Sequence, residues 1–206
     1  MKLTTLLKAI GTFRICTLDA ERSAQNAKSN EGERHAPCAM RHADLPDSDI
    51  GSIHYRAQEV QPGGMFVAII GQNADGHDFM PQAFKRGAAA IITQKEPPQP
   101  FLNEIRAGSP KTRPIIIRVP NTRQTLADLA ACYFGHPSKD MILVGITGTN
   151  GKTTVAYLIE SILRQAGFKV GVIGTINYRY GNKTVVNPMT TPESLDLQRI
   201  LSEMRR

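Results

Sequence analysis

Residues 141–166 place an apolar run, a glycine-rich loop and a helix-like pattern directly after one another. This order constrains the fold more than any other feature of the chain. The run at 141–146 is continuously apolar, as in a strand buried on both faces of a parallel sheet. After the loop, apolar residues recur at the spacing of one helical face: Val155, Leu158, Ile159, Ile162, Leu163 and Ala166. The pattern predicts a buried strand, a turn and an amphipathic helix.

The loop between these elements has the composition of a phosphate-binding turn. Its residues are Gly148, Thr149, Asn150, Gly151, Lys152, Thr153 and Thr154. Glycines allow backbone N–H groups to converge on phosphate oxygens, and the N-terminus of the helix adds the positive end of its dipole. We expect Lys152 to reach the terminal phosphates of ATP, and the Thr153 hydroxyl to bind the Mg²⁺ that they carry. The alternative is an ordinary strand-to-helix turn.

The glycine spacing differs from that of the common P-loop. A common loop would place its first glycine at position 146, which is Ile146 here, whereas the glycines stand at 145, 148 and 151. That run resembles the Mur ligase superfamily of amide-bond-forming synthetases. Gly-Thr-Ile at 174–176 and Thr-Thr-Pro-Glu at 190–193 are similar to its MurE branch. This branch adds a diamino acid to UDP-N-acetylmuramoyl-L-alanyl-D-glutamate.

The resemblance extends upstream and implies substrate contacts. Residues 60–69 and 75–79 are similar to the amino-terminal domain that holds the UDP end of the substrate in these ligases. The family commonly carries Asp-Ser-Arg just before this region; Arg56 is the remaining candidate here, with a solvated surface residue as the alternative. Thr190 and Thr191 stand where the family contacts the UDP-muramyl-dipeptide. Alternatively, one of them caps the helix that follows.

Strand and helix patterns alternate along the first part of the chain, which predicts an α/β fold. We expect strands at 65–70, 88–93 and 115–119, a helix over 78–86, and a second helix capped by Asn121. Residues 11–49 are polar and are expected to be loop-like or partly disordered. The expected domains are a small amino-terminal α/β substrate domain at 1–137 and the beginning of a central ATP-binding domain at 138–206. The latter would hold the first strand–P-loop–helix–strand part of a parallel-sheet P-loop ATPase domain.

Length limits what the second domain can do alone. A P-loop core needs more parallel strands than 141–146 and 169–174 supply, so we expect a truncated and inactive ligase. By resemblance, the complete enzyme uses ATP and Mg²⁺ to form an acyl phosphate on the D-glutamyl carboxylate. The amine of meso-diaminopimelate or L-lysine then displaces the phosphate. The alternatives are another Mur ligase and a truncated nucleotide-binding module without ligase activity.

Charge, cysteines and hydropathy bear on the partners. The net charge is +7, but the basic residues are scattered and aromatic residues are only 6%, so no nucleic acid is expected. The three cysteines are widely spaced, which indicates neither a zinc site nor a disulfide framework. No apolar run is long enough to span a membrane. We expect a cytoplasmic monomer without membrane insertion. His77, between Asp75 and Asp78, is expected to be structural rather than a metal ligand.

Overall fold

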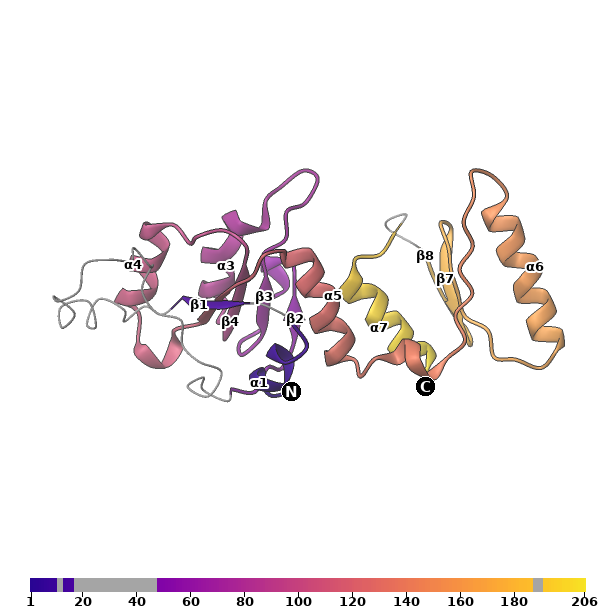
Figure 1. Cartoon of the computed structure of the whole chain (residues 1–206), viewed down its shortest axis with the longest axis horizontal. Helices are drawn as coiled ribbons and strands as arrows, with labels where there is room; N and C mark the ends of the chain where they lie inside the picture. The colour runs from indigo at the N-terminus through magenta and orange to yellow at the C-terminus, as the bar shows by residue number, and fades with distance from the viewer. Residues whose placement is uncertain (11–12, 17–47, 187–190) are drawn as a thin grey trace, which may run out of the picture. The chain divides into compact units, whose positions relative to one another are not determined.

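A computed structural model describes residues 1–10, 13–16, 48–186 and 191–206 of the chain. The chain divides into two compact units, Met1–Tyr133 and Phe134–Arg206 (Figure 1). Each unit has its own sheet and its own helices, so the two are described one after the other.

The first unit is built on a five-stranded sheet in the order β1-β5-β4-β3-β2. The strands are β1 (Arg14–Cys16), β2 (Ile53–His54), β3 (Met65–Val67), β4 (Ala90–Thr93) and β5 (Ile115–Arg118). Strands β2 to β5 are mutually parallel, and β1 is antiparallel to β5. The parallel strands are connected through helices, as expected for an α/β fold, and the predicted class is confirmed.

Helical segments alternate with these strands. They are α1 (Leu3–Leu7), η2 (Ala57–Glu59), η3 (Gly76–Phe79), α3 (Met80–Lys85), α4 (Gln99–Ala107), η4 (Pro110–Thr112) and α5 (Thr122–Tyr133). The helices α1 and α5 contact each other and bury leucines, among them Leu6 and Leu129.

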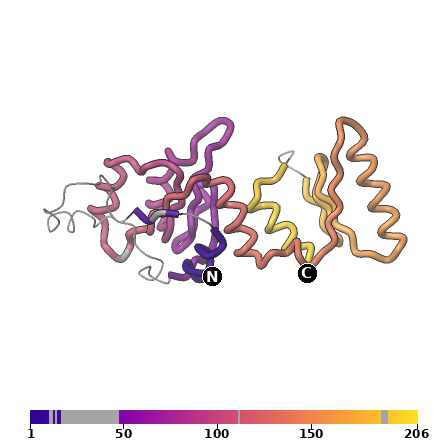
Figure 2. The backbone as a smooth tube through the Cα atoms, in the orientation of Figure 1, coloured from indigo at the N-terminus to yellow at the C-terminus, as the bar shows by residue number. Residues whose placement is uncertain are grey.

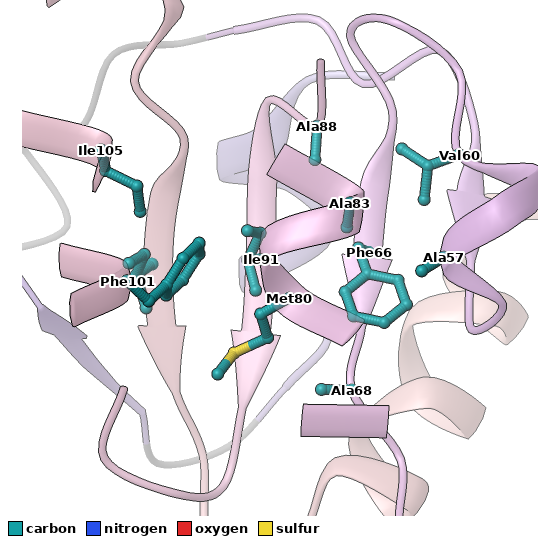
Figure 3. Packing of buried hydrophobic residues seen from close by; sticks show 11 residues of the cluster. Ala57, Val60, Phe66, Ala68, Met80, Ala83, Ala88, Ile91, Phe101 and Ile105 are labelled. Atoms are coloured by element: carbon teal, nitrogen blue, oxygen red, sulfur yellow. The ribbon is translucent and has the colours of Figure 1, made fainter. Parts of the chain in front are cut away.

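The register of the parallel strands places apolar side chains in rows on both faces of the sheet. Phe66, Ile91 and Ile116 are mutual neighbours across β3, β4 and β5, and all three are fully buried. Figure 3 shows Phe66 and Ile91 packed with Met80 of α3 and Phe101 of α4. The intervening residues point to the opposite face. They are also buried, except for the half-buried Ile115, so the sheet is covered on both sides, as parallel sheets require.

Most elements predicted for this unit are confirmed, with small changes of length. The expected strands at 65–70, 88–93 and 115–119 correspond to β3, β4 and β5. Asn121 caps α5 as predicted, because its Oδ1 accepts hydrogen bonds from the N–H groups of Arg123 and Gln124, both at 3.0 Å.

One expectation for this unit was wrong. The polar stretch at 11–49 was expected to be loop-like, yet β1 lies within it and pairs with β5 along three residues. Ile15 of β1 is 4% exposed, so burial of this side chain and pairing with the edge of β5 order the segment. The rest of that stretch, apart from Phe13 and residues 48–49, lies outside the described residues.

The second unit has a small antiparallel sheet between two helices. Its elements are η5 (Pro137–Asp140), α6 (Lys152–Gln165), β6 (Val172–Ile173), β7 (Asn177–Tyr180), β8 (Lys183–Val186) and α7 (Ser194–Met204), with the strands in the order β6-β7-β8. Consecutive side chains of a strand point to opposite faces. Arg179 of β7 bonds Glu160 of α6, whereas Tyr180 bonds Glu203 of α7, so the two helices cover opposite faces of this sheet (Figure 1).

The buried parallel strand predicted at 141–146 is not formed. Figure 2 shows this backbone passing as an extended trace from η5 towards α6, and Ile142 is 86% exposed. A strand requires a neighbour to accept and donate its backbone hydrogen bonds, and β6 to β8 pair only with one another. The strand expected at 169–174 is shortened to β6 and is antiparallel to β7.

Among the described residues, no helix has both the length and the apolar character needed to cross a membrane.

Replacing the capping side chain of α5 tests the account of the first unit. We expect Asn121→Ala to lower the free energy of unfolding by about 1 kcal/mol, because two N–H groups lose their acceptor. Urea denaturation followed by circular dichroism measures this change. Asn121→Asp retains the acceptor and should stay near wild type; an equal loss in both variants would contradict capping as the cause.

Candidate nucleotide-binding site

The loop at 148–154 has a backbone suited to binding an anion. Gly151 is the N-cap of α6 and has a φ of 76°, in the left-handed region that glycine adopts without strain. No side chain caps the helix at this position. The first N–H groups of a helix have no partner within the helix, so those at the start of α6 are available to a ligand. All seven residues of the loop are exposed.

Lys152 brings a positive charge to the same place. It is the first residue of α6, and its Nζ donates to the carbonyl oxygens of Gly148 at 2.5 Å and Thr149 at 3.3 Å. The ammonium group therefore lies over the loop, next to the helix N-terminus. An ammonium group and a helix N-terminus at one exposed loop favour the binding of an anion.

The described residues offer little to a metal ion on their own. No group of three or more histidine, cysteine, aspartate or glutamate side chains within them could hold a metal. Thr153 carries an exposed hydroxyl in the first turn of α6, beside Lys152. A hydroxyl oxygen is a ligand of the kind that Mg²⁺ accepts.

A buried ion pair fixes the helix that presents this loop. The Nε of Arg179 in β7 donates to both carboxylate oxygens of Glu160 in α6, at 3.1 and 3.0 Å, and its Nη2 donates as well. The guanidinium also lies over the ring of Tyr157, 4.1 Å from its centre. The hydrogen bonds from Arg179 lower the pKa of Glu160, so the carboxylate remains charged. The contact positions α6, and with it Lys152, against the sheet.

Only one of the two threonines predicted to contact the substrate lies among the described residues. Thr190 lies outside the described residues. Thr191 is exposed shortly before α7, whose N-cap is Glu193; the Glu193 carboxylate accepts from the N–H of Ser194 at 3.1 Å. The alternative that Thr191 caps this helix is therefore wrong.

Arg56 belongs to the first unit, whereas the loop belongs to the second. It precedes η2, and its Nη1 lies 3.0 Å from a carboxylate oxygen of Glu59. Its guanidinium stands 5.0 Å from the centre of the Tyr55 ring. The side chain is partly exposed and is held by local contacts in this state.

A second polar cluster follows the carboxyl end of β4 in the first unit. His77 is buried, with Nδ1 2.5 Å from Oδ1 of Asp75, and its Nε2 accepts the N–H of Gln94 at 3.1 Å. This acceptor role assigns the proton of the neutral ring to Nδ1. The side chain of Gln94 accepts in turn from the N–H and the hydroxyl of Thr122. The prediction that His77 forms a local hydrogen bond is confirmed by its contact with Asp75, and its structural role stays a prediction.

Asp75 also forms an ion pair with Lys95, which connects this cluster to a positive charge. Burial alone would raise the pKa of Asp75, but hydrogen bonds from Lys95 and His77 hold it well below its usual range. Gln94 and Lys95 were not predicted from the sequence. Their position just after a buried strand could have indicated them, because ligands of open α/β sheets bind at the carboxyl ends of the strands.

Two family profiles match the chain. The profile described as "Mur ligase family, catalytic domain" matches residues 49–134, and "Mur ligase middle domain" matches residues 146–206. The first match covers most of the parallel-sheet unit and contains the His77 cluster. The second begins two residues before the candidate loop.

Two similar curated relatives carry the same name, UDP-N-acetylmuramoyl-L-alanyl-D-glutamate--2,6-diaminopimelate ligase. The protein of Geobacter sulfurreducens is 40% identical over 156 residues, which are 76% of this chain and 28% of the relative. The protein of Alkaliphilus metalliredigens is 42% identical over 156 residues, 76% of this chain and 29% of the relative. The chain therefore spans less than a third of the length of these relatives.

A solved structure with the same name has a related fold. It aligns with a TM-score of 0.53 and 21% identity, over 76% of this chain and 29% of the other.

Removing the charge of Glu160 tests the anchoring of α6. We expect Glu160→Gln to cost about 2 to 3 kcal/mol of stability in the second unit, because Arg179 keeps a largely buried charge without its counterion. Arg164→Gln is the matched control. It removes a half-exposed partner of the same carboxylate and should cost less than about 1 kcal/mol. Hydrogen exchange of the α6 amides measures both.

The stability difference between wild type and Glu160→Gln depends on pH in a defined direction. Because the pKa of Glu160 is lowered from 4.5 in the folded state, the ion pair stabilises fully above pH 4.5. The contribution is lost as the pH falls through the lowered pKa. The gap between wild type and Glu160→Gln should therefore be constant above pH 4.5 and shrink below it. A gap that widens on acidification would contradict the ion pair.

Proposed function

The chain belongs to the Mur ligase family, and on that premise we propose that it is the amino-terminal part of an ATP-dependent ligase. The ligase would add a diamino acid to UDP-N-acetylmuramoyl-L-alanyl-D-glutamate in peptidoglycan precursor synthesis. The observation that carries the proposal is the exposed loop at 148–154, with Lys152 and the free N–H groups of α6 at one place. The shared name of the relatives favours 2,6-diaminopimelate over lysine as the amine.

We assign the expected domain at 138–206, which lies in the second unit, to ATP. The backbone N–H groups of Gly148 to Thr154 would hold phosphate oxygens, and Lys152 would leave the Gly148 carbonyl to bind the terminal phosphate. The Thr153 hydroxyl would hold Mg²⁺, which supplies charge neutralisation when bound. Phosphoryl transfer depends on positioning and charge neutralisation, and these residues would provide both.

We assign the expected domain at 1–137, which contains the first unit, to the UDP end of the substrate. The contact of Arg56 with Glu59 is solvent-exposed and therefore weak, so it would not prevent Arg56 from meeting a diphosphate. Thr190 and Thr191 would donate hydroxyl hydrogen bonds to the muramyl-dipeptide. The D-glutamyl carboxylate would then attack the terminal phosphate, and the resulting acyl phosphate would react with the amine.

This chain alone is proposed to be inactive. It spans less than a third of its relatives, and the predicted parallel strand beside the loop is not formed. The same two facts favour one second candidate, a nucleotide-binding module without ligase activity. Another member of the family, with a different amine, is disfavoured by the shared name of the relatives.

A chimera separates these functions. The matched segment of the Geobacter sulfurreducens ligase is replaced by this chain, and phosphate release is measured with ATP, UDP-N-acetylmuramoyl-L-alanyl-D-glutamate and diaminopimelate. Turnover that requires all three supports the ligase. ATP binding by calorimetry in a stable chimera without turnover supports the module instead. A stable chimera that binds neither ATP nor the UDP-sugar would overturn both.

Lys152→Ala tests the phosphate site. In the chimera we expect about 10- to 100-fold weaker ATP binding, because a charge-assisted hydrogen bond to phosphate is lost. Calorimetric titration with Mg-ATP measures the affinity. Lys169→Ala removes another exposed lysine of the same unit and should leave ATP binding unchanged. Wild-type affinity in Lys152→Ala would remove this residue from the site.

Thr190→Ala combined with Thr191→Ala tests the substrate assignment. We expect about tenfold weaker binding of the UDP-sugar, since two hydroxyl hydrogen bonds are removed, with ATP binding unchanged. Titration with each ligand in turn gives the comparison. Equal losses for both ligands would indicate damage to the fold rather than loss of a substrate contact.

A further inference from the structure

A pocket of about 450 Å³ lies in the second unit, at the opposite end of α6 from the loop at 148–154. Residues of three segments line it: 164–171 at the end of α6 and just after it, the turn at 180–181 between β7 and β8, and the end of α7 at 203–206. A helix rises about 1.5 Å per residue, so α6 separates this pocket from Lys152 by about 20 Å. Small-molecule sites commonly have volumes of about 300 to 1,000 Å³, and this pocket falls within that range.

The one acidic side chain that lines the pocket already has its partners. Glu203 accepts a hydrogen bond from the hydroxyl of Tyr180 at 2.6 Å, and Lys183 lies 3.2 Å from the same carboxylate oxygen. Lys183 does not line the pocket, so it balances the charge of Glu203 without using a cation of the lining. The other charged groups of the pocket therefore keep their positive charge in excess.

Three cations line the pocket: Arg164, Lys169 and Arg206. Arg164 lies 3.0 Å from Glu160, but this carboxylate accepts its main hydrogen bonds from Arg179. Within the described part of the chain, the side chains of Lys169 and Arg206 form neither an ion pair nor a hydrogen bond. Neighbouring cations without counterions attract an anion, and two or three of them suit an anion with two charges.

A structural reason for these cations would be the capping of α6, but the backbone largely fills that role. The N–H of Gly167 donates to the carbonyl of Arg164 and the N–H of Phe168 donates to that of Leu163, both at 3.0 Å. Gly167 has a φ of 85°, which completes the pattern of a Schellman motif. Carbonyl groups at the end of α6 thus have backbone donors, and the side chain of Lys169 remains available to a ligand.

An aromatic ring is presented next to these charges. Phe168 is 56% exposed and lines the pocket together with Val170 and Met204. A Cβ atom at position 171 would lie 2.7 Å from the sulfur of Met204, so glycine here lets the methionine lie against the backbone. An exposed ring offers a face for an aromatic ligand. Phe168 and Lys169 are consecutive, which favours a ligand whose ring and anionic group are close together over a nucleotide, where a sugar separates them.

We propose that this pocket binds a small aromatic acid with two negative charges, of which an aryl phosphate is the simplest example. The ring packs on Phe168, and the phosphate accepts hydrogen bonds from Lys169 and Arg206, with Arg164 at the rim. A phosphate monoester carries about 1.5 to 2 negative charges at pH 7, which matches the excess of positive charge in the lining. The site is separate from the loop at 148–154, and its occupation does not require ligase activity.

Titration of the chain with phenyl phosphate tests the site. The amide signals of residues 168–171 and 203–206 are followed by heteronuclear NMR. We expect saturable shifts of these signals, with about tenfold weaker binding of inorganic phosphate, which has no ring, and of phenol, which has no charge. Absence of saturable shifts at these amides with phenyl phosphate overturns the proposal.

Two substitutions separate the contributions of charge and ring. We expect Lys169→Ala to weaken phenyl phosphate binding about tenfold, because a charge-assisted hydrogen bond is lost. Lys139→Ala removes an exposed lysine of the same unit outside the pocket and should leave binding unchanged. Phe168→Leu should weaken phenyl phosphate about two- to tenfold and leave inorganic phosphate unchanged. The replaced side chains are exposed, so the unfolding temperature should stay near wild type.

A third substitution distinguishes this pocket from the candidate nucleotide loop. In Lys152→Ala we expect the shifts at 168–171 and 203–206 to persist with unchanged affinity. If Lys152→Ala abolishes them and Lys169→Ala does not, phenyl phosphate binds at the loop and the proposal is overturned. Equal affinity in wild type and Lys169→Ala overturns it as well. Because no nucleotide is present in these titrations, an inactive chimera would count against the proposed ligase and not against this pocket.

Discussion

Backbone pairing between parallel strands governs how each part of this chain is ordered. In the first unit, β2 to β5 satisfy one another and bring Phe66, Ile91 and Ile116 into one buried row. In the second unit the most apolar segment has no such neighbour and stays extended and exposed, although its sequence is as apolar as β5. Hydrophobicity brings a segment out of water only where hydrogen-bond partners are also present.

The candidate site depends on a different kind of contact. The loop at 148–154 is exposed and makes few contacts of its own, so its position is set by α6, which the pair between Glu160 and Arg179 fixes to β7. A buried charged pair is directional in a way that apolar contacts are not. It therefore defines the rotation of α6 about its axis, and with it the direction of Lys152.

Local patterns in the sequence were sufficient to predict many of the strands, helices and turns. The strands at 88–93 and 115–119 and the cap at Asn121 follow from short patterns whose partners lie in the same unit. The loop and the helix after it were also predictable, because glycine and helix periodicity act locally. Roles for Lys152, Thr153, Thr190, Thr191 and Arg56 in binding remain predictions.

The features that were not predicted correctly share one physical cause: the structure of these segments depends on residues distant in sequence. Residues 14–16, within a largely polar stretch, become a strand only because the edge of β5 is available. Gln94 gains its role only where His77 and Thr122 converge on it. The run at 141–146 reads as a strand but needs strands beside it, and no property of the run itself reveals whether they are present.

The extended run at 141–146 also bears on how long the chain survives in a cell. Proteases bind substrates as extended backbones, and cleavage concentrates where the backbone is exposed and free of hydrogen bonds. This run meets both conditions without any prior unfolding of either unit. A cut there would separate the parallel-sheet unit from the loop and α6. Unless the run is covered, degradation, rather than thermal unfolding, would therefore set the lifetime of the nucleotide site.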